Sequence, residues 1–117
     1  MADQLQQQLA ELSGQLSETV NQLKITDANL VALDTEKRRN ELTFNEVQQY
    51  EETRNLYKPV GRAYVLMGKA EMTERLQVNI ARNEAEIQEM RTRQEALCKR
   101  RDEVSNNIQE LVSSLKQ

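Results

Sequence analysis

Two heptad repeats of apolar residues constrain this chain more than any other feature of its sequence. From Leu5 onward, apolar side chains recur at alternating steps of four and three, at positions 5, 9, 12, 16, 19, 23, 26, 30, 33 and 37. Seven of these ten residues are leucine, and the exceptions are Thr19, Thr26 and Lys37. Such steps form the narrow apolar stripe of a coiled coil, whereas a helix of a globular domain has a broader stripe. The N-terminal part is therefore predicted to be a coiled-coil helix.

A second repeat occupies the C-terminal half, at positions 76, 80, 83, 87, 90, 94, 97, 101, 104, 108, 111 and 115. Nine of these twelve residues are apolar, namely Leu76, Ile80, Ile87, Met90, Leu97, Val104, Ile108, Leu111 and Leu115. No proline or glycine follows Gly68, so nothing in the sequence interrupts a helix over 69–117.

The two repeats match when the chain folds back on itself with its turn centred at Val60. The polar interruptions then share layers: Arg101 lies opposite Thr19, Gln94 opposite Thr26, and Asn83 opposite Lys37. A slip of one heptad places Arg101 opposite Leu12, where its charge would need another partner or an escape to water. This agreement favours an intramolecular antiparallel coiled coil over a long parallel dimer.

The region after Lys37 departs from the heptad, and two interpretations remain open there. Thr43 and Glu46 have the spacing of a capping box, which indicates a new helix start after a break near 41–43. The alternative is that the first helix continues through this point with a stutter. In either case the N-terminal helical segment is expected over 3–54.

A β-hairpin is predicted over 55–68, between the helices. Pro59 and Gly61 are turn residues, and the apolar run Ala63–Met67 is rich in strand-forming side chains. All four aromatic residues of the chain lie between positions 44 and 64. An isolated hairpin is marginal in water and both its edges accept further strands. We therefore expect hairpins from several subunits to share one sheet or barrel, through Leu56, Tyr57, Val60, Gly61, Arg62, Tyr64, Val65 and Leu66.

The expected fold class is thus mainly α, a long antiparallel coiled-coil hairpin with a single β-hairpin joining its helices at one end. Residues 1–117 are expected to form a single domain: an N-terminal helix (3–54), an assembly hairpin (55–68) and a C-terminal helix (69–117). Aromatic residues make up only 3% of the chain, too few to fill a large globular core.

Composition excludes several classes of function. The chain has no histidine and a single cysteine, Cys98, so no catalytic, metal or cofactor site is expected. The net charge of -3 and the pI near 5.1 argue against a nucleic-acid partner. The longest apolar run, Ala63–Met67, is far shorter than the roughly 20 residues that span a membrane. No secretory signal pattern opens the sequence, so a soluble cytoplasmic protein is expected.

The central segment resembles the β-class subunits of prefoldin. The similarity is carried by the run from Tyr57 to Leu66, which is like the family's Tyr-x-x-Val-Gly-Arg-x-Phe-x-Leu stretch, and by Leu42, Thr43, Glu46 and Val47 upstream. Tyr64 stands where the family often has phenylalanine.

The resemblance implies a hetero-hexamer of two α-class and four β-class subunits, whose hairpins form a double β-barrel. It further implies that coiled-coil tips hold non-native proteins such as actin and tubulin, without ATP, and deliver them to the cytosolic group II chaperonin.

The helix ends also indicate how such binding would work. Helix ends fray because their terminal backbone groups lack partners. Fraying would expose apolar side chains that hold an unfolded segment, namely Leu5, Leu9, Leu12, Ile108, Leu111, Val112 and Leu115. Residues 1–23 add an acidic character, with Asp3, Glu11 and Glu18 and no lysine or arginine. The alternative is that these residues merely complete the coiled coil. The rival function is a structural coiled-coil adaptor, which a continuous helix through 56–67 would favour.

Overall fold

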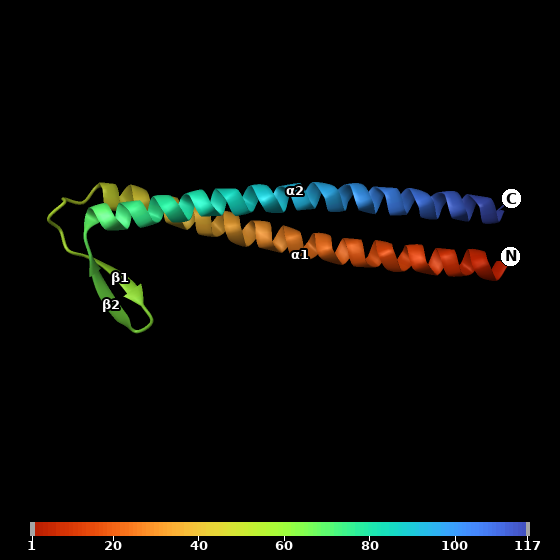
Figure 1. The fold of residues 1–117 in the computed structure, drawn as a ribbon, viewed down its shortest axis with the longest axis horizontal. Coiled ribbons are helices and arrows are strands. Elements are labelled where there is room, and N and C mark those ends of the chain that lie inside the picture. Colours follow the sequence, from red (N-terminus) through yellow and green to blue (C-terminus); the bar gives the residue numbers. More distant parts are fainter. Residues whose placement is uncertain (1, 117) are drawn as a thin grey trace. The chain divides into compact units, whose positions relative to one another are not determined.

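The computed structural model describes residues 2–116 and contains two long helices joined by one hairpin (Figure 1). Helix α1 spans Ala2–Gln48 and helix α2 spans Lys69–Lys116. Strands β1 (Leu56–Val60) and β2 (Ala63–Met67) lie between them and form a two-stranded antiparallel sheet. The predicted fold class is confirmed. Gln117, the last residue of the predicted C-terminal helix, lies outside the described residues, and the single domain stays a prediction.

The described chain divides into two compact units. The first comprises α1 as far as Leu30 and α2 from Glu89 onward, and the second runs from Val31 to Gln88 and includes the hairpin. Within each unit the two helices lie side by side and run in opposite directions (Figure 1).

The seam of the first unit contains buried threonines as well as buried apolar residues. Thr19 and Thr26 are each 3% exposed, and they are buried with Leu23 of α1 and Leu97 and Val104 of α2. Their hydroxyls donate to the carbonyls one turn earlier in α1, those of Gln15 (2.8 Å) and Gln22 (2.9 Å). Because these bonds lie within α1, both threonines are satisfied without a partner on α2.

In the second unit the seam continues where the sequence suggested that the heptad ends. Asn40 and Phe44 are half-buried and Val47 is buried, which extends the steps of three and four beyond Lys37. The Asn40 amide donates to the Asn83 side-chain oxygen at 2.9 Å. Asn83 thus bonds to Asn40, about one turn beyond the Lys37 expected opposite it, and Lys37 approaches Glu84, the neighbour of Asn83, at 3.4 Å.

Helix α1 runs without a break through 41–43 and ends at Gln48, six residues before the predicted end at 54. The Thr43 hydroxyl donates to the carbonyl of Arg39, as a threonine in a helix interior does, so it caps no new helix. After Gln48 the backbone winds more tightly than an α-helix, because the N–H groups of Gln49 and Tyr50 bond to carbonyls three residues back. This tightening closes the helix and begins the loop to β1.

The strands fall inside the predicted hairpin segment, and a two-residue turn joins them. Val60 pairs with Ala63 next to the turn, and Leu56 pairs with Met67 at the far end. Gly61 has a φ of 61°, whereas no other described residue has a positive φ. A positive φ at the first central residue alone matches a type II′ turn, whose twist suits a hairpin. Glycine at this position therefore sets the register of the strands.

Candidate functional site

Among residues 2–116, the buried contacts of the hairpin with the helices lie at its open end. Leu56 is 8% exposed and forms a buried cluster with Val47 of α1 and Leu76 of α2. Met67, which pairs with Leu56 across the sheet, is also buried. The partly buried side chains of Phe44, Tyr50 and Met72 pack against this cluster. This small core fixes the base of the hairpin.

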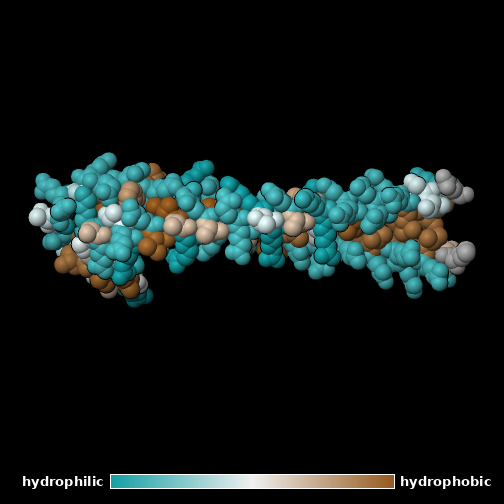
Figure 2. Space-filling view, turned by 45° about the horizontal axis from the view of Figure 1, so that its top comes forward, coloured by the Kyte–Doolittle hydropathy of each residue, from teal (hydrophilic) through white to brown (hydrophobic). Residues whose placement is uncertain are grey.

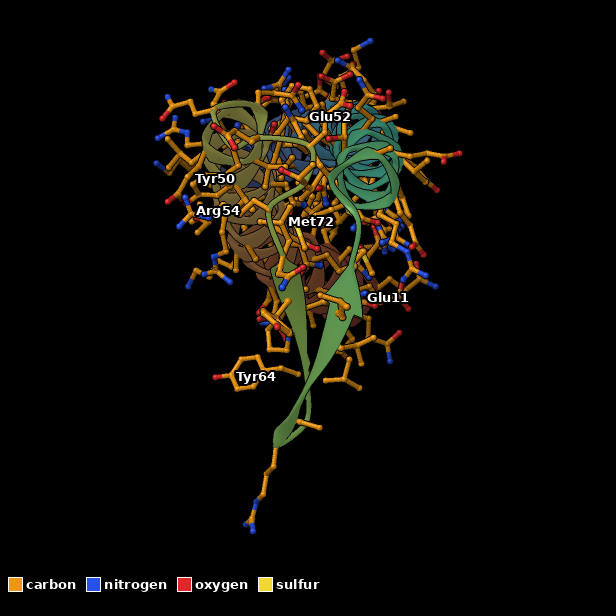
Figure 3. All side chains as sticks on the ribbon, turned by 90° about the vertical axis from the view of Figure 1, so that its left-hand side faces the viewer. Glu11, Tyr50, Glu52, Arg54, Tyr64 and Met72 are labelled. Carbon is orange, nitrogen blue, oxygen red and sulfur yellow. The ribbon has the colours of Figure 1, made fainter. Side chains whose placement is uncertain are left out.

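Beyond this anchor both faces of the hairpin are exposed and largely apolar. Alternation along the strands places Tyr57, Pro59, Tyr64 and Leu66 on one face, and Lys58, Val60, Ala63 and Val65 on the other. All eight are exposed, with Tyr64 at 73% and Leu66 at 60%. Figure 3 shows the Tyr64 ring projecting outward from the hairpin. Figure 2 shows brown hydrophobic surface in this region. A monomeric protein rarely leaves such a patch uncovered.

The residues predicted to mediate assembly therefore occupy three kinds of position. Leu56 lies in the local core, so its side chain supports the hairpin from inside the chain. Gly61 and Arg62 form the turn, at the end remote from the helices. The remaining five residues are exposed on the strands: Tyr57, Val60, Tyr64, Val65 and Leu66.

Two of the four aromatic residues serve the chain's own fold, which the sequence did not indicate. Phe44 packs in the core at the hairpin base, and the Tyr50 hydroxyl donates to a Glu46 carboxylate oxygen at 3.0 Å. The Arg54 guanidinium lies 4.5 Å from the centre of the Tyr50 ring (Figure 3). The bond to Glu46 and its negative charge raise the pKa of Tyr50, and Arg54 opposes the shift.

Sequence reasoning also missed that Lys69 of α2 caps the C-terminal end of α1. Helix α1 has no basic residue in its last turn. Lys69, at the start of α2, supplies the cation instead, because its ammonium group donates to the carbonyls of Gln48 (3.2 Å) and Tyr50 (2.9 Å). Carbonyls at a helix C-terminus carry partial negative charge and lack partners, so this contact satisfies them. No motif near Gln48 or Lys69 in the sequence indicates this contact.

In the first unit, the seam loosens toward the start of α1 and the end of α2. No described residue of α1 before Thr19 and none of α2 after Val104 is buried. The predicted client-binding residues lie here: Leu5, Leu9, Leu12, Ile108, Leu111 and Val112 are half-buried, and Leu115 is 44% exposed. A groove opens between Leu12 and Leu111, bordered by Glu11 and Glu110. Brown hydrophobic surface runs between the helices at this end in Figure 2.

Among residues 2–116, no cluster of side chains has the composition of a metal site. No helix in the same range is long and apolar enough to cross a lipid bilayer. Two features remain as candidate binding surfaces: the exposed hairpin and the loosely packed ends of the helices in the first unit.

Paired antiparallel helices joined by one exposed apolar hairpin are typical of a chain whose hairpin packs against other polypeptides. The family model described as "Prefoldin subunit" matches residues 3–114 of this chain. The chain therefore belongs to the prefoldin subunit family, whose members are non-enzymatic subunits of a chaperone complex.

Relatives and solved structures agree with this assignment. The chain is 29% identical to prefoldin subunit 1 of Arabidopsis thaliana over 109 residues, covering 93% of this chain and 80% of the relative. It is 25% identical to prefoldin subunit 1 of Homo sapiens, covering 93% and 89% of the two chains. The crystal structure of the prefoldin beta subunit from Thermococcus strain KS-1 superposes with a TM-score of 0.79 at 20% identity, covering 88% and 90%. The resemblance to β-class subunits is confirmed, and both of these relatives are named prefoldin subunit 1, the β-class subunit that the Val60-Gly61-Arg62 stretch most resembles.

Proposed function

We propose that this chain is a subunit of a hetero-hexameric prefoldin complex in the cytoplasm, built from two α-class subunits and further β-class subunits. The complex works as an ATP-independent holdase that binds non-native proteins of the actin and tubulin type at the helix tips. It then delivers them to the group II chaperonin. Assembly uses the hairpin, and client binding uses the loosened ends of α1 and α2.

The single observation that carries this proposal is the exposure of the hairpin on both faces. Tyr57, Tyr64 and Leu66 on one face and Val60 and Val65 on the other are each about half exposed or more. A two-stranded sheet is marginal in water by itself, and this one also has two unpaired edges. Partner subunits that cover its faces and edges remove both costs.

The helix tips support a weak and general binding surface. A tip that buries a few hundred Å² of apolar area gains several kcal/mol at roughly 25 cal/mol per Å². Association costs about 4–15 kcal/mol, so one tip binds poorly alone. Several tips in one complex raise the effective concentration and make the joint binding useful. The half-buried state of Leu12 and Leu111 suits this role, because little packing must open to expose them.

The structure lacks the feature that would favour the rival function, a structural coiled-coil adaptor. A continuous helix through 56–67 would favour an adaptor, and the structure has two strands there. An adaptor has no need of a sheet whose aromatic residues face solvent. The chaperone function is therefore the better supported of the two.

The test compares two pairs of substitutions that line the same groove at the tip. Leu12→Ser with Leu111→Ser removes its apolar side chains, and Gln15→Ser with Asn107→Ser changes only polar ones. Each variant is assembled with the other subunits, and suppression of client aggregation is followed by light scattering. We expect the leucine pair to weaken suppression severalfold and the polar pair to leave it near wild type.

Deletion of residues 1–12 and 108–117 extends this test. We expect the deletion to abolish suppression while native mass spectrometry still finds the hexamer. Unchanged suppression by the deleted form would refute the tip mechanism and leave assembly standing.

A further inference from the structure

We infer that the groove between Leu12 and Leu111 selects among unfolded segments, and that it favours those in which lysine or arginine stands beside apolar residues. Glu11 and Glu110 are the residues that make this selection. The inference rests on the proposed binding of non-native proteins at the helix tips, and it adds to that proposal the chemical class of segment that binds best.

The groove combines apolar side chains with charge of a single sign. Leu12 and Glu11 border it from α1, and Leu111 and Glu110 border it from α2. Its volume is about 460 Å³, and both leucines are half-buried. A bound segment therefore meets a carboxylate from each helix beside the leucines. The other described residues that line the groove are uncharged, namely Gln8, Gln15, Asn107 and Ser114.

Neither of these carboxylates is neutralised within the described chain. Among residues 2–116, none of the ion pairs includes Glu11 or Glu110, and both side chains are exposed. No lysine or arginine precedes Lys24 in the sequence, and only Lys116 follows Arg101. Two like charges beside one groove repel each other, so a cation that a bound segment supplies would relieve that repulsion.

The same end of the first unit carries more negative charge than the whole chain. Residues 1–18 and 103–117 contain five acidic residues and one basic residue, a formal charge of -4, whereas the chain has a net charge of -3. In the second unit, by contrast, acidic residues pair with basic ones one turn away, as Asp34 does with Arg38 at 3.2 Å and Glu71 with Arg75 at 3.3 Å. The carboxylates at the groove are left for a cation from outside this chain.

A basic and apolar segment gains from both features of the groove. Its apolar side chains leave water against the leucines, and its lysine or arginine groups pair with the carboxylates. An exposed charge pair changes a binding constant by about 1.5-fold to fivefold, so two such pairs change it by roughly twofold to 25-fold. An acidic segment meets like charge and binds more weakly. The apolar contact thus admits many segments, and the carboxylates decide which of them bind best.

Two matched pairs of substitutions separate this effect from that of overall charge. Glu11→Gln with Glu110→Gln removes both carboxylates of the groove and keeps the size of the side chains. Glu18→Gln with Glu103→Gln removes the same charge from the same two helices, at exposed positions that do not line the groove. Each variant is assembled with the other prefoldin subunits, and native mass spectrometry verifies that the complex has formed.

The probes are three short peptides that carry the same leucines and differ at two positions, which are lysine, serine or glutamate. Each peptide contains a photoreactive benzophenone group, so mass spectrometry of the irradiated complex measures the cross-links to this chain alone. In the wild type, we expect about fivefold more cross-links from the lysine peptide than from the serine peptide, and fewer from the glutamate peptide. In Glu11→Gln, Glu110→Gln the three yields should lie within about twofold of one another, whereas Glu18→Gln, Glu103→Gln should keep the wild-type preference to within about 1.5-fold.

Salt provides a second measurement on the unsubstituted complex. Between about 0.1 M and about 1 M salt, the preference for the lysine peptide over the serine peptide should fall below about twofold, because the ions screen exposed charges. The serine peptide should bind at both concentrations, since its contact is apolar. A preference that does not depend on salt would overturn the role of the two carboxylates.

The remaining outcomes separate this inference from the proposed function. Equal yields from the lysine and serine peptides in the wild type, or an unchanged preference in Glu11→Gln, Glu110→Gln, would overturn the inference and leave client binding standing. Competition by native lysozyme, a folded basic protein, as strong as that by the lysine peptide would assign the groove to folded surfaces and would also overturn it. A wild-type complex that cross-links to none of the three peptides would contradict the proposed client binding and this inference with it.

Discussion

The hydrogen bond between Asn40 and Asn83 yields the sharpest prediction about stability. Asn83 is 2% exposed, and its side-chain oxygen accepts the Asn40 amide at 2.9 Å. No buried side-chain nitrogen or oxygen of the described residues lacks a hydrogen-bond partner. Asn40→Ala removes the donor and leaves the Asn83 oxygen in a site that water reaches poorly. We expect this substitution to destabilise the second unit.

The size of the effect follows from burial. An unsatisfied polar group in such a site costs about 1–3 kcal/mol. Asn45 is an exposed asparagine of the same helix, so Asn45→Ala changes helix propensity equally without losing a buried bond. Asn83→Leu, added to Asn40→Ala, removes the unpaired group and places an apolar side chain in the seam. We expect it to recover about 1 kcal/mol or more of the loss.

Urea unfolding followed by far-UV circular dichroism measures these differences, provided that the slope of the free energy against urea stays constant among variants. The free energy of unfolding should fall in Asn40→Ala, stay level or rise in Asn45→Ala, and recover in the Asn40→Ala, Asn83→Leu double variant. If the double variant were less stable than Asn40→Ala alone, the cost would come from lost packing and not from an unpaired oxygen, and the reasoning would be refuted.

Two further predictions concern the loop that leads to the hairpin. Lys69→Met removes the bonds to the Gln48 carbonyl at the end of α1 and to the Tyr50 carbonyl in the loop that follows. We therefore expect a loss of about 1 kcal/mol in the free energy of unfolding by urea and faster amide exchange over 49–55, with Lys69→Arg as the conservative control. If amide exchange over 49–55 were unchanged in Lys69→Met, capping of α1 by Lys69 would be contradicted. Glu46 raises the pKa of Tyr50 above 10.0, so the contact stabilises the fold below that pH and the contribution disappears as pH rises through the raised pKa. Glu46→Gln should lower the midpoint of tyrosine ionisation seen by ultraviolet absorbance, and an unchanged midpoint would exclude this cause.

The coiled coil was predictable because the spacing of its apolar residues is set by close neighbours in the sequence and repeats along both helices. Steps of three and four place leucines on one stripe, and the polar exceptions in each repeat restrict the antiparallel register. Gln94 was expected opposite Thr26, and its amide donates to the adjacent Asp27 at 2.6 Å. Thr26 bonds to a carbonyl of its own helix, so Gln94 on the facing helix pairs with the carboxylate next to Thr26 and not with its hydroxyl. Matching of polar layers therefore located the register to within a turn but did not identify each pair.

The end of α1 was not predictable, because it depends on a residue remote in sequence. Lys69 lies 21 positions after Gln48, whose carbonyl it binds, and no local signal near Gln48 announces that contact. The capping-box spacing at Thr43 was misleading for a related reason. A threonine hydroxyl bonds to a backbone N–H at a helix start and to a carbonyl one turn back inside a helix. The sequence alone does not distinguish the two.

Phe44 and Tyr50 lie at the base of the hairpin and not on its exposed faces, and this placement bears on function. A hairpin that recruits other subunits must be held at a fixed angle, or its edge would meet a neighbouring strand in many orientations and lose ordering entropy on each encounter. Phe44 and Tyr50 contribute to the core that holds it, and Tyr57 and Tyr64 remain exposed.

Apolar burial is distributed unevenly, and each unit has what its proposed task requires. In the second unit, Val47, Leu56, Met67 and Leu76 are all under 10% exposed, so local opening at the hairpin base costs several buried side chains. In the first unit, the first turns of α1 and the last turns of α2 contain no buried residue, so opening there costs little. A rigid surface favours a single strand register in an assembly, whereas a surface that opens cheaply accepts unrelated apolar segments. The same heptad pattern occurs in both units. How deeply a leucine is buried depends on the residues around each seam position and not on the pattern itself.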